Sequence, residues 1–272
     1  MGFIIVAFAG RLKKENRNDN TKYLRKSARK VLAQTVLSVL FMIMPLLAIS
    51  QNVFSLEFSL PNRDGVNIHY RFIADYEVAV ISKRSVSYQG IINIPTTVNY
   101  GGRSCTVVKI EEAAFYNCAL LLEITLPGTI VEIGRMAFCG CRNLQSINFS
   151  RNLKKLGEAC FANCSSLKDV VLPNSLEYVG KSAFYDCANL KRVVLSRRMV
   201  EIKFNSFGNC EKLTDVIIPE GVKYIDMAAF DNCKSLEVIS LPSSIPLMNR
   251  NVFMERFNLK KIKVQGNSIY MK

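Results

Sequence analysis

Cysteine is the residue of this chain whose spacing most resembles a chemical site. Six of the nine cysteines recur at intervals of 23 residues, at Cys118, Cys141, Cys164, Cys187, Cys210 and Cys233. Thiols in a regular series can form disulfides, bind a metal ion or lie protonated in a core. The elements that position them decide which of the three applies.

The same 23-residue step governs the residues around the cysteines. A phenylalanine stands three residues before each cysteine and a leucine three residues after it, and both series continue for one further unit, where Arg256 replaces cysteine. The phenylalanines are Phe115, Phe138, Phe161, Phe184, Phe207, Phe230 and Phe253. A fixed period of this length predicts stacked structural units in place of one ordinary globular domain.

One unit, residues 167–189, shows how such a coil is built. Val170 and Leu172 are inward positions of a short β-rich run, and Pro173 ends it by removing a hydrogen-bond donor. Gly180 is expected to permit a tight bend before the return leg, which carries Phe184. Because one coil cannot bury its own apolar face, we predict stacked coils with parallel strands and a continuous column of phenylalanines.

Stacking favours buried free thiols over disulfides and over a metal site. Equivalent side chains on stacked coils point in parallel, which suits disulfide bridging poorly. A zinc site needs clustered ligands, and the chain holds one histidine, His69. We therefore expect the column to fill a core layer without needing a partner, with disulfides and then metal binding as the less favoured interpretations. Cys105, Cys139 and Cys160 lie outside the column, and Cys160 replaces a small core residue.

The stretch "IGRMAFCGCRNLQSINF" and its siblings resemble the BspA-like, or Treponema pallidum-type, leucine-rich repeats over residues 107–264. Ser150 and Ser196 depart from the proline of this pattern, and Lys203 and Asp226 depart from its glycine. The resemblance implies an α/β repeat solenoid: a right-handed coil of leucine-rich-repeat type, with a parallel β-sheet on the concave face and a β-rich N-terminal cap. It also implies an exported or cell-surface protein of bacteria with binding roles such as adhesion, and names no ligand or catalytic residue.

The first 50 residues are typical of an export signal. A basic segment precedes the apolar stretch Val36–Ala48, and Ala48-Ile49-Ser50 forms a small-x-small cleavage site. The apolar run Val31–Ile49 also approaches the length of a membrane span, so an uncleaved anchor is the second interpretation. In both cases the positive flank predicts that the repeats lie outside the cell.

The remainder divides into three parts. Residues 51–107 are expected to form the β-rich cap, in which 92–98 aligns with 124–130 and a hairpin turns at Gly101-Gly102. Residues 108–264 hold seven 23-residue units, and 265–272 form a C-terminal tail. The lysines at 260, 261 and 263 are expected to protect the last strand as a sheet edge.

Strand alternation predicts one candidate partner-binding surface. Val171, Val194 and Ile217 occupy the same outward position in three successive strands, where they form an apolar patch. A second outward column, at Asp169, Arg192 and Asp215, flanks it. In a purely structural interpretation, the β-branched residues only suit the strands and the charges only stabilise the sheet.

Composition and motifs exclude several functions. Half of the net charge of +14 lies in residues 1–50, and the rest of the chain mixes acids with bases, so nucleic-acid binding is not expected. Nucleophile, phosphate-binding and metal motifs are missing from the sequence, so we predict no enzyme, cofactor or metal.

We therefore expect an exported or cell-surface interaction or adhesion module. Its partner would be a protein or glycan ligand, such as one of the host extracellular matrix or cell surface, with membrane contact only through an uncleaved N-terminal segment. Two further hypotheses are a structural or spacer segment of the cell envelope, and a fragment of a longer surface protein.

Overall fold

The structure is a computed structural model that describes residues 56–83, 87–245, 252, 260–264 and 267–270. The chain divides into two compact units, one of Met1–Gln51 with Tyr100–Arg103, and one of Asn52–Asn99 with Ser104–Lys272. The fold below is that of the second unit. The predicted export signal and the membrane anchor that could replace it lie outside the described residues. Within the described ranges, no helix has the length and apolarity to cross a membrane.

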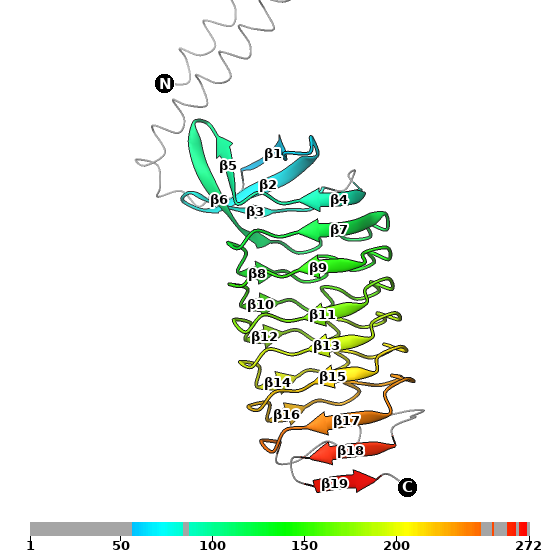
Figure 1. The fold of residues 1–272 in the computed structure, drawn as a ribbon. Coiled ribbons are helices and arrows are strands. Elements are labelled where there is room, and N and C mark those ends of the chain that lie inside the picture. Colours follow the sequence, from blue (N-terminus) through cyan, green and yellow to red (C-terminus); the bar gives the residue numbers. More distant parts are fainter. Residues whose placement is uncertain (1–55, 84–86, 246–251, 253–259, 265–266, 271–272) are drawn as a thin grey trace, which may run out of the picture. The chain divides into compact units, whose positions relative to one another are not determined.

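One ladder of parallel strands, the front ladder, runs along the stacked coils (Figure 1). From β7 onward its pairing register advances by 23 residues per coil, as in Val170 opposite Val193 and Val193 opposite Val216, whereas Ile92 of the first strand pairs with Ile124, 32 residues later. This confirms the stacked 23-residue unit and the parallel sheet. The front strands are β4 (Gly90–Asn93), β7 (Leu121–Thr125), β9 (Ser146–Asn148), β11 (Asp169–Val171), β13 (Arg192–Val194), β15 (Asp215–Ile217), β17 (Val238–Leu241) and β18 (Lys261–Val264).

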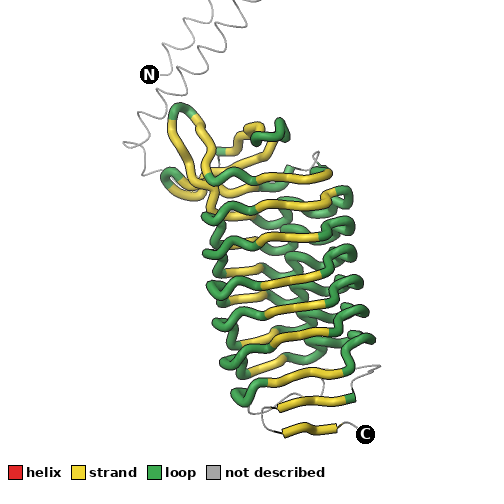
Figure 2. Tube along the Cα trace, viewed as in Figure 1, coloured by secondary structure: helices red, strands yellow, loops and turns green. Residues whose placement is uncertain are grey.

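A second ladder, the back ladder, forms on the opposite leg of each coil from strands of two residues. These strands are β8 (Glu132–Ile133), β10 (Lys155–Leu156), β12 (Tyr178–Val179), β14 (Glu201–Ile202) and β16 (Tyr224–Ile225). Apart from one 3-10 residue at Val252, the described part of the solenoid consists of strands and turns (Figure 2). The solenoid is therefore confirmed, whereas the α part of the expected α/β class is not: the described coils are all β and turn.

Left-handed residues explain why the return leg does not become a helix. Each coil holds two residues with positive φ four positions apart, such as Ser182 (53°) and Asp186 (58°), and these interrupt the helical backbone. The second position carries residues that adopt this conformation readily. They are Asn117, Gly140, Asn163, Asp186, Asn209 and Asn232.

The expected phenylalanine column is confirmed for six of its seven members. Successive rings from Phe115 to Phe230 lie 5.0–5.5 Å apart between centroids, with interplanar angles of 2–8°. Tyr88 ends the stack at the cap, 4.9 Å from Phe115 and tilted by 48°. Phe253 lies outside the described residues.

The glycine of the repeat serves coil packing and not the predicted tight bend. Gly180 does not have a positive φ, but a Cβ there would lie 2.5 Å from the backbone nitrogen of Glu158 in the preceding coil. A Cβ at Gly157 or at Gly134 would likewise lie 2.4 or 2.6 Å from a backbone nitrogen of the preceding coil. Glycine is therefore required because adjacent coils approach too closely for a side chain.

The expected β-rich cap is present and continues into the back ladder. Strands β1 (Glu57–Pro61), β2 (Asn67–Ala74) and β3 (Glu77–Val80) pair antiparallel in sequence, and β3 pairs parallel with β6 (Arg103–Ile110). Strand β5 (Thr97–Tyr100) pairs with the first part of β6, and the last two residues of β6 pair with β8. The cap therefore covers the start of the solenoid core.

The C-terminal end differs from the prediction. Strand β19 (Asn267–Tyr270) pairs antiparallel along the whole of β18, so the lysine-bearing β18 is an interior strand and not an edge. The predicted tail at 265–272 therefore contributes a strand to the sheet.

Candidate binding surfaces on two faces of the coils

The cysteines are built into the core and offer no reactive group. All nine are buried and free. Five column thiols donate to phenylalanine carbonyls of the preceding coil at 3.1–3.2 Å. The pairs are Cys141 to Phe115, Cys164 to Phe138, Cys187 to Phe161, Cys210 to Phe184 and Cys233 to Phe207. The expected column of buried thiols is confirmed, and the hydrogen bonds to the preceding coil are an addition that the sequence did not predict.

Burial keeps these thiols protonated. Desolvation raises the pKa of Cys187 to about 12 and does the same for Cys233. Because the thiolate is the nucleophilic and metal-binding form, the raised pKa values disfavour both kinds of chemistry at neutral pH. The described residues also hold no group of three or more potential metal ligands.

The structure brings the predicted apolar residues together on the front ladder. Val171 and Ile217 are 59% and 43% exposed, and Val194 lies half-buried between them in direct register. Ser240 follows Ile217 in the same register, so a polar residue ends the row. We call Val171, Val194 and Ile217 the front patch.

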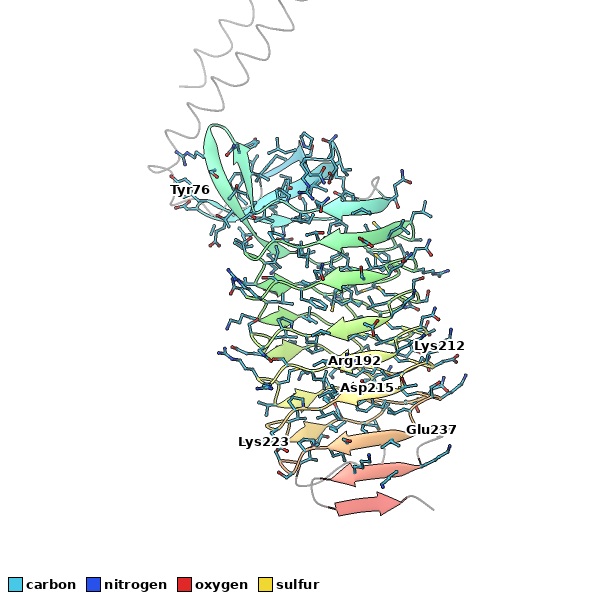
Figure 3. All side chains as sticks on the ribbon, viewed as in Figure 1. Tyr76, Arg192, Lys212, Asp215, Lys223 and Glu237 are labelled. Carbon is cyan, nitrogen blue, oxygen red and sulfur yellow. The ribbon has the colours of Figure 1, made fainter. Side chains whose placement is uncertain are left out.

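The charges flanking the front patch form a single ion pair. Arg192 lies between Asp169 and Asp215 in the strand register. Its Nε lies 3.1 Å from Oδ2 of Asp215, on the neighbouring strand (Figure 3). The predicted ladder of three charges is therefore reduced to Arg192 and Asp215. An exposed pair of this kind contributes little stability, which leaves both groups available to a partner.

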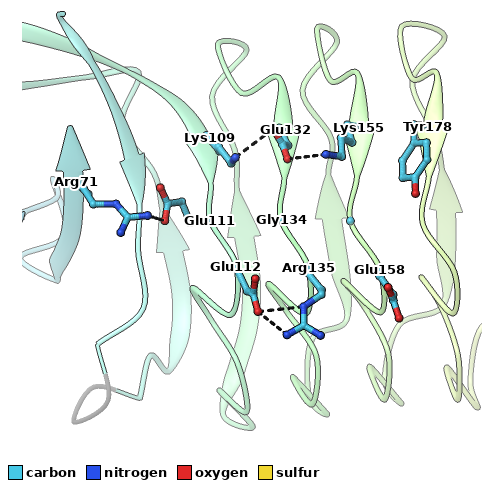
Figure 4. A pocket seen from close by; sticks show the side chains of 11 residues that line it. Arg71, Lys109, Glu111, Glu112, Glu132, Gly134, Arg135, Lys155, Glu158 and Tyr178 are labelled. Carbon is cyan, nitrogen blue, oxygen red and sulfur yellow. Dashed lines mark hydrogen bonds and ion pairs between the residues drawn. The ribbon is translucent and has the colours of Figure 1, made fainter. Parts of the chain in front are cut away.

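A second candidate surface lies on the back ladder, and sequence reasoning missed it. A depression of about 470 Å³ extends over β8 and β10, from Arg71 and Glu111 at the cap to Tyr178 on β12. We call it the back groove. Figure 4 shows one row of side chains from Lys109 to Tyr178 and a second row from Glu112 to Glu158, with Gly134 between the rows.

Ion pairs neutralise the back groove internally. Glu132 lies 3.2 Å from the ammonium groups of both Lys109 and Lys155. Partial burial would raise the pKa of Glu132, but hydrogen bonds and charge from the two lysines outweigh it and lower that pKa. Arg135 binds Glu112 at 2.7 Å, and Arg71 pairs with Glu111.

Tyr178 closes the far end of the back groove with an aromatic ring. The residue is 43% exposed, and the ammonium groups of Lys155 and Lys203 lie 5.9 and 5.1 Å from the ring centroid. The sequence does contain the signal for this row, because Lys109, Glu132, Lys155 and Tyr178 follow one another at 23-residue steps.

The cap contains a smaller hollow of about 360 Å³ around His69. His69 lies opposite Ser59 in the pairing of β1 with β2. Burial, followed by the charge of Lys83, lowers the pKa of His69, while Glu57 raises it. Within the described ranges no side-chain hydrogen bond is found between the His69 imidazole and the Ser59 hydroxyl.

Coils of 23 residues, two parallel ladders and buried columns of leucine, phenylalanine and cysteine define a leucine-rich-repeat solenoid. The chain belongs to the family with the BspA type leucine rich repeat region. Six copies of that repeat match over residues 92–211 and 179–272.

A solved bacterial structure shares the fold. The chain is 26% identical to a leucine rich cell surface protein from Faecalibacterium prausnitzii A2-165, with a TM-score of 0.65 over 76% of this chain and 54% of that one. A Treponema pallidum leucine rich repeat protein is 24% identical, with a TM-score of 0.48 over 69% of this chain and 89% of that one. The chain thus spans about half of the Faecalibacterium protein. No curated protein matches it.

Proposed function

We propose that this chain is an exported, non-catalytic surface protein that binds a protein partner through the front patch. The observation that carries the proposal is the in-register exposure of Val171, Val194 and Ile217 on adjacent strands. Removing apolar surface of this kind from water is favourable, so covering the front patch would contribute to the binding of a partner. Arg192 and Asp215 beside it supply polar groups that orient the partner.

The similarity to a cell surface protein supports the location, and the basic and apolar N-terminal segment supports export. A protein outside a bacterial cell meets host extracellular-matrix and cell-surface proteins, which makes adhesion the first function to test. The front patch is mainly aliphatic, so a protein surface complements it better than a polar ligand does.

One observation favours a structural role as the second candidate. Several exposed charged residues pair with a residue 23 positions away on the adjacent coil, so part of the exposed charge serves contacts between coils. Examples are Lys154 with Glu177, Lys234 with Glu211 and Lys260 with Glu237. A spacer in the cell envelope would need only such pairs.

The test is binding of the full chain to immobilised host matrix proteins and to the envelope of the producing cell. The double variant Val171→Ser with Ile217→Ser replaces the two most exposed residues of the front patch. Val131→Ser with Val200→Ser is the matched control, because these valines are 42% and 54% exposed and each directly precedes a back strand.

Capture of a matrix protein by the wild type and the control, with at least about tenfold weaker capture by the patch variant, supports the proposal. Equal capture by all three proteins, or retention of envelope material alone, favours the structural role. Thermal unfolding of each variant verifies that the solenoid is intact.

A further inference from the structure

The back groove is lined mainly by charged side chains, whereas the front patch is aliphatic, so the two surfaces suit different classes of ligand. We propose that it binds a neutral, hydroxyl-rich chain: an uncharged oligosaccharide lying along the solenoid axis. The site is separate from the protein-binding surface proposed above and extends beyond that function.

The shape of the back groove suits an extended ligand. Lys109, Glu132 and Lys155 pair directly from β6 to β8 to β10, so one side chain of this row projects from each successive coil. Coils in a parallel ladder are about 4.8 Å apart. A linear chain along the axis therefore meets a new hydrogen-bonding group at each coil.

The glycines explain why the space between the two rows is open. Gly134 and Gly157 line the groove, and the packing of adjacent coils excludes a side chain at both positions. In later coils the same position carries Lys203 and Asp226. The open floor is therefore confined to the part of the solenoid near the cap, where the groove lies.

The charge balance selects against ionic ligands. The groove is lined by four cations, Arg71, Lys109, Arg135 and Lys155, and four anions, Glu111, Glu112, Glu132 and Glu158. The first three anions already bind the cations. A charged polymer would have to break these pairs to be attracted, whereas hydroxyl groups can donate to the carboxylates and accept from the ammonium and guanidinium groups without breaking them.

Tyr178 and Glu158 complete a saccharide site. The exposed part of the Tyr178 ring at the end of the groove, beside the ammonium groups of Lys155 and Lys203, offers carbon surface to the C–H groups of a sugar ring. Glu158 points from the second row beside Arg135 and offers carboxylate oxygens to hydroxyl groups (Figure 4). An apolar peptide finds little to bind, because the remaining lining is charged residues and glycine.

The experiment uses the full chain and three neutral tetrasaccharides, cellotetraose, maltotetraose and xylotetraose, with Kd measured by ligand-observed NMR titration. The variants are Tyr178→Ala and Glu158→Gln. Tyr224→Ala is the matched control, because Tyr224 begins another back strand with the same 43% exposure and lies outside the groove.

We expect saturable binding of at least one tetrasaccharide, little change when the salt concentration is raised, and about tenfold weaker binding in Tyr178→Ala and Glu158→Gln. Tyr224→Ala and the front-patch variant should bind as the wild type does, so failure here is distinct from failure of the proposed function. The inference is overturned if none of the three sugars binds, if Tyr178→Ala binds equally well, or if only a sulfated oligosaccharide or a peptide occupies the groove.

Discussion

The thiol of Cys187 donates a hydrogen bond to the carbonyl oxygen of Phe161, 26 residues earlier in the chain, at 3.2 Å. The same oxygen accepts the backbone N–H of Cys164 within its own coil at 3.3 Å. Both lone pairs of a buried carbonyl are thereby used, and one of the two bonds joins adjacent coils. The recurring cysteine therefore donates a hydrogen bond to a buried carbonyl oxygen in the return turn of the preceding coil, and it also fills a core layer.

We predict that these thiols make the protein unstable at alkaline pH. Their pKa values are raised from an ordinary value of 9.0, so the unfolded chain loses thiol protons that the folded chain retains. The stability they contribute is complete below about pH 9 and falls as the pH rises toward 12. Each thiol lowers the free energy of unfolding by about 1.4 kcal/mol per pH unit in this range.

Urea unfolding of the reduced protein at pH 7.5, 9 and 10 measures this slope. Cys187→Ala should lower the free energy of unfolding by about 1–2 kcal/mol at pH 7.5, because contacts and a hydrogen bond are lost. Above pH 9 its free energy of unfolding should fall less steeply with pH than that of the wild type, because one titrating thiol is missing. If the free energy of unfolding fell equally steeply with pH in the variant and the wild type, Cys187 would not contribute to the alkaline instability. A thiol reagent should label the native protein poorly and the unfolded protein completely.

The close approach of coils at Gly157 gives a second prediction. Gly157→Ala places a methyl group 2.4 Å from the backbone nitrogen of Arg135, and backbone cannot move aside as a side chain can. We expect a loss of about 3 kcal/mol or more in the free energy of unfolding. Gly128→Ala is the control, because a Cβ there meets nothing within 4 Å.

Both glycine variants are compared by urea unfolding at pH 7. A change within about 0.5 kcal/mol is expected for the control. Similar stability of the two variants would show that the coils can separate at little cost, and that glycine is not required by packing.

Glu132 provides a prediction in the acidic range. Its side chain is 27% exposed and bound by two lysines, and its pKa is lowered in the folded protein. Because the unfolded carboxyl titrates near 4.5, the stabilisation is present above that pH and is lost as the pH falls through the lowered folded value. Glu132→Gln should therefore cost about 1 kcal/mol at pH 7 and progressively less at pH 4 and below.

Glu112→Gln is the comparison for this variant, because Glu112 is more exposed and binds one cation. Its cost at pH 7 should be smaller than that of Glu132→Gln. A cost for Glu132→Gln that does not change between pH 7 and pH 3 would show that the two lysines do not hold the carboxylate.

The repeating period determined most of the fold without any structure. Residues such as Phe184 and Val193 recur in equivalent positions, and identical coils have one efficient way to bury them, which is stacking in register. The outward row at Val171, Val194 and Ile217 followed from strand alternation for the same reason. The absence of helix in the described coils did not follow, because it depends on left-handed residues such as Ser182, a type that seldom marks that conformation.

Contacts between coils were decided by the tertiary structure alone. Cys187 meets Phe161 and Gly180 meets Glu158 across coils, and which atoms face each other there depends on the path of the turn and not on the 23-residue spacing. The back groove likewise combines Arg71 of the cap with Tyr178 two coils beyond β8, residues that no single repeat contains. Periodic sequence specifies what every coil shares, whereas a site arises where neighbouring coils differ, and only their packing brings those differences together.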